Sequence, residues 1–229
     1  MLLLFDVDGT LLQGATEAHR DAVYAALRTV HGVDASSVRK GVSAAGRTDG
    51  DIAREILLGA GISAERIDDR ADEFREEVCR MYARLCPMDL PHTVLPGVPE
   101  LLAWLSGRDG SRTALLTGNY EPVARLKLAR AGIGGAFERG QGAFGSDSED
   151  RAALPAIARR RAGTVGVPYP RAGTIVVGDT PRDIACARAD GVRCVAVASG
   201  PCPAEELAGA DAVAANAVEL GGALEALGV

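Results

Sequence analysis

Residues 2–10 read LLLFDVDGT, an apolar run that stops at an aspartate, followed two positions later by a second aspartate and then a glycine. A short apolar run that ends abruptly at polar residues is typical of a strand buried on both faces of a parallel sheet. We therefore expect a strand over residues 2–7 that opens into a loop at Gly9. Similar runs, each a further expected strand, recur at residues 113–116, 174–177, 192–198 and, more weakly, 212–214.

Helical patterns lie between these expected strands. Residues 122–131 and 181–189 each have a proline in the first turn and a glycine beyond their end, as helices often do. Alternation of strands and helices indicates a doubly wound sheet with helical connections. The sequence thus predicts an α/β fold with a Rossmann-like, doubly wound parallel sheet.

The alternation is interrupted between residues 15 and 92, where no convincing strand pattern occurs. Because a helical bundle needs apolar stripes, the apolar spacing there predicts helices around residues 18–30, around residues 52–57 and along residues 67–85. We expect Asp49 or Asp51 to cap the second of these helices.

An insertion after the first strand lies over the carboxyl ends of the strands, where open α/β sheets bind ligands. We therefore expect residues 1–14 and 93–229 to form a catalytic core. Residues 15–92 would form a helical-bundle cap domain that covers the site as a lid. The proline-containing stretch 91–99 is expected to be the return linker.

The composition excludes several functional classes. The 229 residues carry a formal net charge of −6 and only 4% aromatic residues, which argues against a binder of nucleic acid. No apolar run approaches the roughly 18 residues of a membrane span, and the N-terminal residues lack the features of a signal peptide. The five scattered cysteines form no CxxC pair, which argues against a zinc site or a disulfide framework. We expect a cytoplasmic protein with no nucleic-acid or membrane partner; the sequence is silent on oligomeric state.

Two pairs of aspartates follow expected strands. Asp6 and Asp8 end the first strand, and strand alternation places both on one side. Asp179 follows the strand at 174–177, and Asp183 lies one helical turn later. Close carboxylates repel each other unless a cation lies between them or one is protonated, and hard oxygen ligands suit Mg²⁺. The four together predict a Mg²⁺ site, although a turn or a helix cap alone could explain either pair.

A third expected strand ends in LLTGN, residues 115–119. The hydroxyl of Thr117, the turn at Gly118 and the amide of Asn119 precede a helix. This pattern suits a cradle for phosphate oxygens, and it suits an ordinary turn equally well.

Three basic residues could balance the carboxylates or hold an anion. Lysine occurs only at positions 40 and 127, and Lys127 borders the apolar face of its helix, from which it could reach carboxylates and a phosphate. Arg151, at the start of the next helix, is its rival. Arg47, at the start of a cap helix, could contact an anionic substrate, or could belong to a solvated turn. Surface or cap positions are expected for all three histidines, His19, His31 and His92.

Three motifs, DVDGT at 6–10, LLTGN at 115–119 and VVGDTPRD at 176–183, occur in this order at expected strand ends. In this combination the chain resembles the haloacid dehalogenase superfamily of phosphohydrolases, and its helical insertion resembles that of the phosphoglycolate-phosphatase-like branch. The resemblance covers nearly the whole chain. It implies a Mg²⁺-dependent phosphatase that hydrolyses a small phosphate monoester, phosphoglycolate-like or sugar-phosphate-like, through an aspartyl-phosphate.

The resemblance also implies roles for single residues. Asp6 would be the nucleophile. Asp8 would protonate the leaving group and then activate water. Thr117 would hold a phosphoryl oxygen, with Gly118 and Asn119 beside it in the phosphate-binding loop.

The metal ligands implied by the resemblance are Asp6, the backbone carbonyl of Asp8, Asp179 and Asp183. The third motif of the family is a basic residue, often a lysine followed by proline, shortly before the last acidic motif. That pair is absent, since residues 147–152 read DSEDRA. We prefer Lys127 as its substitute, because some relatives carry a lysine on the helix after the threonine motif; Arg151 occupies the more usual place.

Other functions remain as alternatives. A phosphomutase would keep every one of these core residues. A dehalogenase would lack the carboxylate of Asp8, and a phosphonate hydrolase would differ there and use a cap lysine, for which Lys40 is available. A non-catalytic phosphate-binding relative would have lost a core aspartate, and a phosphorylatable signalling receiver would be shorter and without an insertion.

Overall fold

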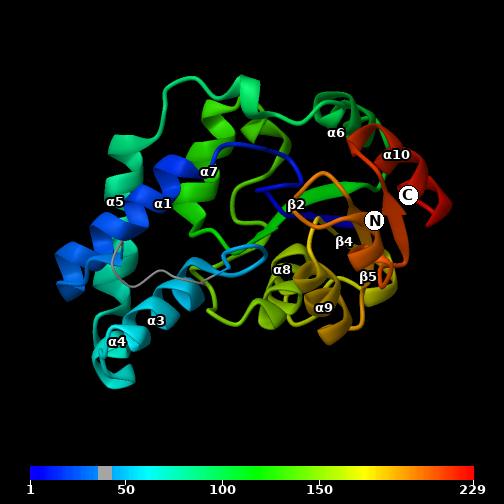
Figure 1. The fold of residues 1–229 in the computed structure, drawn as a ribbon. Coiled ribbons are helices and arrows are strands. Elements are labelled where there is room, and N and C mark those ends of the chain that lie inside the picture. The colour runs from blue at the N-terminus through cyan, green and yellow to red at the C-terminus, as the bar shows by residue number, and fades with distance from the viewer. Residues whose placement is uncertain (36–42) are drawn as a thin grey trace.

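The computed structural model describes residues 1–35 and 43–229 (Figure 1). Its centre is a six-stranded parallel sheet with the strand order β3-β2-β1-β4-β5-β6. This is the order of Rossmann sheets, so the expected α/β fold with a doubly wound core is confirmed. The strands are β1 (Leu2–Phe5), β2 (Arg112–Thr117), β3 (Ala143–Phe144), β4 (Thr174–Gly178), β5 (Arg193–Val197) and β6 (Ala212–Ala214).

The helices of the described residues fall into a group between β1 and β2 and a group that connects the later strands. The α-helices are α1 (Glu17–Ala26), α3 (Asp49–Gly59), α4 (Ala64–Asp69), α5 (Ala71–Leu85), α6 (Val98–Ser106), α7 (Glu121–Arg130), α8 (Leu154–Ala162), α9 (Pro181–Ala189) and α10 (Ala217–Ala226). The shorter turns are the π-helical η1 (Leu27–His31) and the 3₁₀ turns η2 (Pro91–Thr93), η3 (Gly134–Ala136), η4 (Arg151–Ala153), η5 (Arg171–Gly173) and η6 (Ala204–Leu207).

Each face of the sheet carries its own apolar core, because successive strand residues point to opposite faces. On β1, Leu3 and Phe5 belong to the core shared with α6, α7 and α10, whereas Leu2 and Leu4 belong to the core shared with α8 and α9. Helices thus cover both faces. This explains why the strand sequences are continuous apolar runs instead of alternating ones.

The strand order reverses at β1. Phe5, the last residue of β1, pairs with Leu115 of β2 on one side and with Val177 of β4 on the other. The carboxyl ends of these three strands therefore meet at one edge of the sheet. The crevice at such a reversal is where open α/β sheets bind ligands.

The inserted helices α1, α3, α4 and α5 lie to one side of this edge, at the left of Figure 1. The stripe predicted along residues 67–85 is present, since α5 buries Phe74, Val78 and Tyr82. The apolar core of these helices is continuous with that beneath α7. The limits of the cap at residues 15 and 92 stay a prediction. None of the helices in the described part of the chain combines the length and apolar content needed to cross a membrane.

One strand was missed by the sequence analysis. The predicted strands are all present with small shifts of their ends, but β3 was not expected. It consists of Ala143 and Phe144 alone, between Gly142 and Gly145, so no apolar run marks it. It exists because it pairs with β2 at the edge of the sheet, and pairing of this kind depends on tertiary context more than on local propensity.

Three details of the cap helices differ from expectation. The helix expected over residues 18–30 ends at Ala26 and continues as the π-helical turn η1. The stripe at 67–85 is divided at Arg70, whose backbone leaves helical geometry with φ −113° and ψ 13°. The N-cap residue of α3 was predicted wrongly. It is Thr48, whose Oγ1 accepts a hydrogen bond from the backbone N–H of Asp51. A threonine cap leaves the Asp49 carboxylate available for other contacts.

A buried ion pair joins α8 to the end of α9. Arg159 donates hydrogen bonds of 2.6 and 2.9 Å to the two carboxylate oxygens of Asp190, and both side chains are buried. Burial alone would raise the pKa of Asp190, but the hydrogen bonds and charge of Arg159 hold it below its usual value. The guanidinium is therefore matched by a fully ionised partner at neutral pH.

We predict that Asp190→Ala lowers the free energy of unfolding by about 3–5 kcal/mol, because it leaves the Arg159 guanidinium buried without its counter-charge. Urea denaturation of the variant and the wild type measures the change. Glu205→Ala, which removes an exposed carboxylate, is the control and should leave the midpoint unchanged. A midpoint for Asp190→Ala equal to that of the control would contradict the prediction.

Candidate active site

The carboxyl ends of three neighbouring strands bring predicted site residues to one place. Asp6 follows β1, Thr117 ends β2 and Asp179 follows β4. All three line a cavity of about 510 Å³, whose opposite wall includes His19 of α1 and Ile52 of α3. A cavity of this size, with a few polar groups converging on an otherwise apolar wall, suits a small ligand.

Three of the predicted aspartates form a buried cluster. Carboxylate oxygens of Asp6, Asp179 and Asp183 all lie within 4.8 Å of one another. Thr10 Oγ1 donates a 2.8 Å hydrogen bond to Asp179 Oδ1, while Asp179 Oδ2 is buried without a hydrogen-bond partner. Gly9, with φ +91°, packs against this oxygen, since a Cβ there would lie 2.2 Å from it. An orphaned oxygen among converging carboxylates fits a divalent cation that prefers oxygen ligands, such as Mg²⁺.

The ionisation of this cluster is strongly perturbed. Burial raises the pKa of Asp6 to about 6, opposed by the charge of Arg151 and reinforced by Asp183. Burial likewise raises the pKa of Asp179 to about 8, with further contributions from Asp6 and Asp183. Carboxylates held this close resist full ionisation unless positive charge compensates them.

Asp183 both caps a helix and belongs to the cluster. Its Oδ2 accepts hydrogen bonds from the backbone N–H of Thr180 at 3.0 Å and from Thr180 Oγ1 at 2.7 Å. This is a capping box at the start of α9. Its Oδ1 accepts a hydrogen bond from Arg151. The two interpretations that the sequence left open, helix cap and cluster member, therefore apply together.

Asp8 has a different set of partners. Lys127 Nζ lies 2.8 Å from both of its carboxylate oxygens, and Asn119 Nδ2 donates to its Oδ2 at 2.9 Å. Burial would raise the pKa of Asp8, but the Lys127 charge and these hydrogen bonds hold it below its usual value. Strand alternation does not extend to Asp6 and Asp8, because β1 ends at Phe5; both aspartates line the cavity, but through separate contacts.

Both basic candidates for the third motif reach the site. Lys127, on α7, is fully buried and also donates to Asn119 Oδ1 at 3.0 Å. Arg151, on η4, contacts Asp6 at 3.2 Å and Asp183, and it lines the cavity. The two cations thus occupy separate positions, Lys127 beside Asp8 and Arg151 beside the aspartate cluster.

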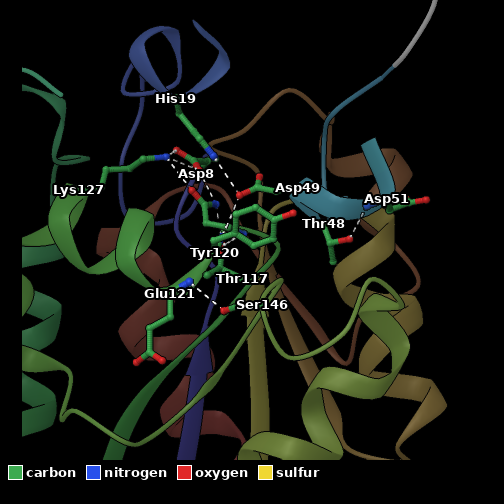
Figure 2. A network of polar contacts seen from close by, with 11 residues as sticks. Asp8, His19, Thr48, Asp49, Asp51, Thr117, Tyr120, Glu121, Lys127 and Ser146 are labelled. Atoms are coloured by element: carbon green, nitrogen blue, oxygen red, sulfur yellow. Dashed lines mark hydrogen bonds and ion pairs between the residues drawn. The ribbon is translucent and has the colours of Figure 1, made fainter. Parts of the chain in front are cut away.

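The loop after β2 is held in shape by its own side chains. Thr117 Oγ1 accepts hydrogen bonds from the backbone N–H and the side-chain amide of Asn119, at 3.3 and 2.9 Å. Thr117, Gly118 and Asn119 all line the cavity. The same Asn119 amide donates to Asp8, so the loop and Asp8 form one network (Figure 2).

The cap candidate Arg47 also lines the cavity. Its guanidinium forms ion pairs with two carboxylates of α3, that of Asp51 at 2.5 Å and that of Glu55. Its role toward a substrate stays a prediction. Lys40, the other cap residue singled out in the sequence, lies outside the described residues.

Two buried polar residues of the cap, His19 and Asp49, line the cavity although the sequence did not predict them as site residues. His19 is only 8% exposed and lines the cavity, although no pattern in the sequence distinguished it from a surface histidine. Its Nε2 lies 3.1 Å from Oδ2 of Asp49, which is itself buried. The sequence predicts Asp49 only as a possible N-cap, whereas its carboxylate contacts His19 and the backbone of Tyr120 (Figure 2).

Residues 1–191 match the family model described as haloacid dehalogenase-like hydrolase. The chain belongs to this family. The match includes every predicted catalytic and metal-binding residue, and it confirms the superfamily that the three strand-end motifs indicated.

Curated relatives carry the name phosphoglycolate phosphatase. The protein of that name from Rhodospirillum rubrum is 30% identical over 203 residues, covering 86% of this chain and 79% of the relative. The one from Pseudomonas fluorescens is 31% identical over 204 residues, covering 87% and 70%. These similarities, with the family match, confirm the expectation of a phosphatase-type hydrolase of this branch.

Solved structures share the fold at lower identity. The β-phosphoglucomutase of Clostridium difficile superposes with a TM-score of 0.68 at 16% identity, covering 99% of this chain and 96% of that one. CbbY from Rhodobacter sphaeroides, solved in complex with phosphate, gives 0.64 at 22% identity, with 96% of each chain covered. At identities this low, the similarity shows that these proteins share the fold of the core and of the inserted cap.

We predict that, in the presence of a chelator, the melting temperature falls as the pH rises from about 5 to about 9. The folded-state pKa of Asp179 is about 8, against an ordinary value of 3.8. The stability that its protonated form contributes is complete below the ordinary value and is lost as the pH rises through the folded value. Differential scanning calorimetry across this range measures the slope.

Asp179→Asn removes this ionisation and should flatten the slope, whereas Asp109→Asn, at an exposed position, should keep it. Mg²⁺ should raise the melting temperature of the wild type more at pH 8 than at pH 5, because a cation stabilises the charged cluster. Equal slopes for wild type and Asp179→Asn would contradict the assignment.

Proposed function

We propose that this protein is a cytoplasmic, Mg²⁺-dependent phosphatase that hydrolyses a small phosphate monoester through an aspartyl-phosphate on Asp6. The observation that carries the proposal is the convergence of Asp6, Asp179 and Asp183 on one cavity. Uncatalysed hydrolysis of a phosphate monoester is among the slowest of reactions. A carboxylate nucleophile divides it into two easier displacements.

In the first displacement, an Asp6 oxygen attacks phosphorus, and the bond from phosphorus to the leaving oxygen breaks as Asp8 gives that oxygen a proton. In the second, Asp8 takes a proton from water, and the water oxygen attacks phosphorus, which frees Asp6 and releases phosphate. Lys127 and Asn119 favour the carboxylate form of Asp8, which is the form that activates water. Before the first displacement, Asp8 therefore has to take up a proton, from solvent or from a substrate bound as its monoanion, and it passes that proton to the leaving oxygen.

Charge and orientation come from the surrounding groups. Mg²⁺, when bound by Asp6, Asp179, Asp183 and the Asp8 carbonyl, supplies positive charge to the phosphoryl oxygens. The hydroxyl of Thr117 would orient one of those oxygens, with Gly118 and Asn119 beside it. We assign the role of the third-motif cation to Lys127, because it bonds Asp8 and Asn119 together.

The substrate is proposed to be a small phosphorylated metabolite, phosphoglycolate-like or sugar-phosphate-like. The names of the curated relatives support the first kind. Arg47 and Arg151, both in the cavity wall, are the proposed contacts with its phosphate or leaving group. A screen of phosphorylated metabolites, with Mg²⁺ and with chelator, tests the class.

A phosphomutase is the second candidate, because it would use the same core residues. The two differ in the fate of the phosphoryl group: a phosphatase passes it to water, and a mutase passes it back to a sugar phosphate. Release of free phosphate at the rate of substrate consumption favours the phosphatase.

We predict that Asp6→Asn lowers Mg²⁺-dependent phosphate release from an aryl phosphate by at least about 10³-fold, because an amide is a far weaker nucleophile than a carboxylate. Phosphate is measured colorimetrically. The surface variant Asp109→Asn should keep wild-type turnover. Turnover by Asp6→Asn close to that of the wild type would refute the nucleophile assignment.

We predict that Lys127→Ala lowers kcat for an aryl phosphate by about 10²-fold and by more than Arg151→Ala does. The reason is that Lys127 balances the charge of Asp8 and bonds Asn119 of the loop after β2, so its loss disturbs groups that act on the substrate. Circular dichroism must show both variants folded. If Arg151→Ala loses more, the third motif belongs to Arg151.

A further inference from the structure

The first turn of α3 makes two backbone-level contacts with the phosphate loop of the core, which we define as residues 117–120. The backbone N–H of Asp49 donates to the carbonyl of Gly118 at 2.9 Å. The backbone N–H of Tyr120 donates in return to Asp49 Oδ2, also at 2.9 Å. One cap residue therefore bonds both a donor and an acceptor of the phosphate loop.

The same carboxylate also holds a cap histidine. His19 Nε2 lies 3.1 Å from Asp49 Oδ2, and the His19 ring packs edge-on against Tyr82 with 5.6 Å between ring centroids. His19 adds to the electrostatic effects that lower the pKa of Asp8. Figure 2 shows His19 reaching from α1 toward Asp8 and Asp49, above the loop. Asp49 thus joins α1, α3 and the phosphate loop at one oxygen.

These contacts are not needed to build the helix. Thr48 caps α3 by accepting the N–H of Asp51, so the Asp49 carboxylate is not required for this. The backbones also approach too closely for side chains to intervene: a Cβ on Gly118 would lie 1.9 Å from the carbonyl oxygen of Arg47. The first turn of α3 and the phosphate loop are therefore in direct backbone contact, which any movement of the cap away from the core would break.

Other contacts dock the cap without touching this network. Arg54 of α3 pairs with Glu149 of the core, with Nε 2.5 Å from Oε2. Arg182 donates to the carbonyl of Ala45 at 3.1 Å. These contacts hold the cap on the core but bond neither the phosphate loop nor His19, and so they provide an internal comparison for Asp49.

We propose that Asp49 is a positioning residue that couples closure of the cap to the shape of the phosphate loop and to the orientation of His19 in the cavity. Opening the cap removes the acceptor of the Tyr120 N–H, and it carries His19, which Asp49 holds, away from the core in the same step. The loop then has its reactive geometry only when the cap covers the cavity, which keeps bulk water out during phosphoryl transfer. This inference rests on the proposed phosphatase function.

The first experiment measures the hydrogen bond between the Tyr120 N–H and the Asp49 carboxylate, and it does not depend on activity. Amide hydrogen exchange of the segment 117–124 reports the Tyr120 N–H. Asp49→Ala should increase its exchange rate by about tenfold or more, because the acceptor is gone. Asp49→Asn, which keeps an acceptor oxygen, should retain most of the protection. Glu65→Ala, at an exposed first-turn carboxylate of α4, should not change it.

The second experiment separates positioning from docking by kinetics on an aryl phosphate. Asp49→Ala should lower kcat by about tenfold or more with KM changed by less than about threefold, because loop geometry and not binding is lost. Asp49→Asn should recover most of kcat. Arg54→Ala, which weakens docking alone, should keep kcat within about threefold of the wild type.

Two results would overturn the proposal. Unchanged exchange at Tyr120 in Asp49→Ala would show that the bond is not made in solution. An equal loss of kcat in Arg54→Ala and Asp49→Ala would show that Asp49 acts only as one of several docking contacts. If the wild type released no phosphate from any monoester, the proposed function would fail. The exchange experiment would still test whether Asp49 bonds the Tyr120 N–H.

Discussion

Three carboxylates confined within a few ångströms in a buried position form the constraint around which this protein is organised. In a medium of low polarity their mutual repulsion is too large for all of them to be charged without a compensating cation. Asp6 and Asp179 respond by holding their protons to unusually high pH. Arg151 contacts Asp6 and Asp183 and neutralises part of this excess charge, whereas Lys127 balances the neighbouring Asp8. The orphaned oxygen of Asp179 is free to accept a further positive charge.

The fold supplies this constraint through the ends of three strands. β1, β2 and β4 are neighbours in a sheet whose order reverses at β1, so residues far apart in sequence meet without any long loop. Rigid parallel strands fix the positions of Asp6, Thr117 and Asp179, and the helices that follow β2 and β4 begin at the same edge. The inserted cap then completes the far wall of the cavity with His19 and Ile52, so the cavity is lined by both core and cap.

The sequence was informative wherever local pattern and global fold coincide. LLLFDVDGT predicts β1 and its aspartates because a buried strand must be apolar and a strand end need not be. The cap stripe on α5 followed from helical spacing for the same reason. Features that depend on distant partners were out of reach: β3 exists only beside β2, and the contacts of Asp49 and His19 join segments that no spacing relates. That Lys127 and Arg151 lie beside different aspartates was also out of reach, because no sequence pattern relates either residue to its carboxylate partner.

Because Asp183 belongs both to a capping box and to the acidic cluster, the effects of substitutions at this position have two causes. One oxygen of this side chain ties down the first turn of α9 through Thr180, and the residue also belongs to the acidic cluster. A substitution that removes the carboxylate therefore loosens the first turn of the helix and also removes one of the three carboxylates of the acidic cluster. Any loss of turnover at this position mixes two origins, and replacements that preserve capping while changing ligand strength are needed to separate them.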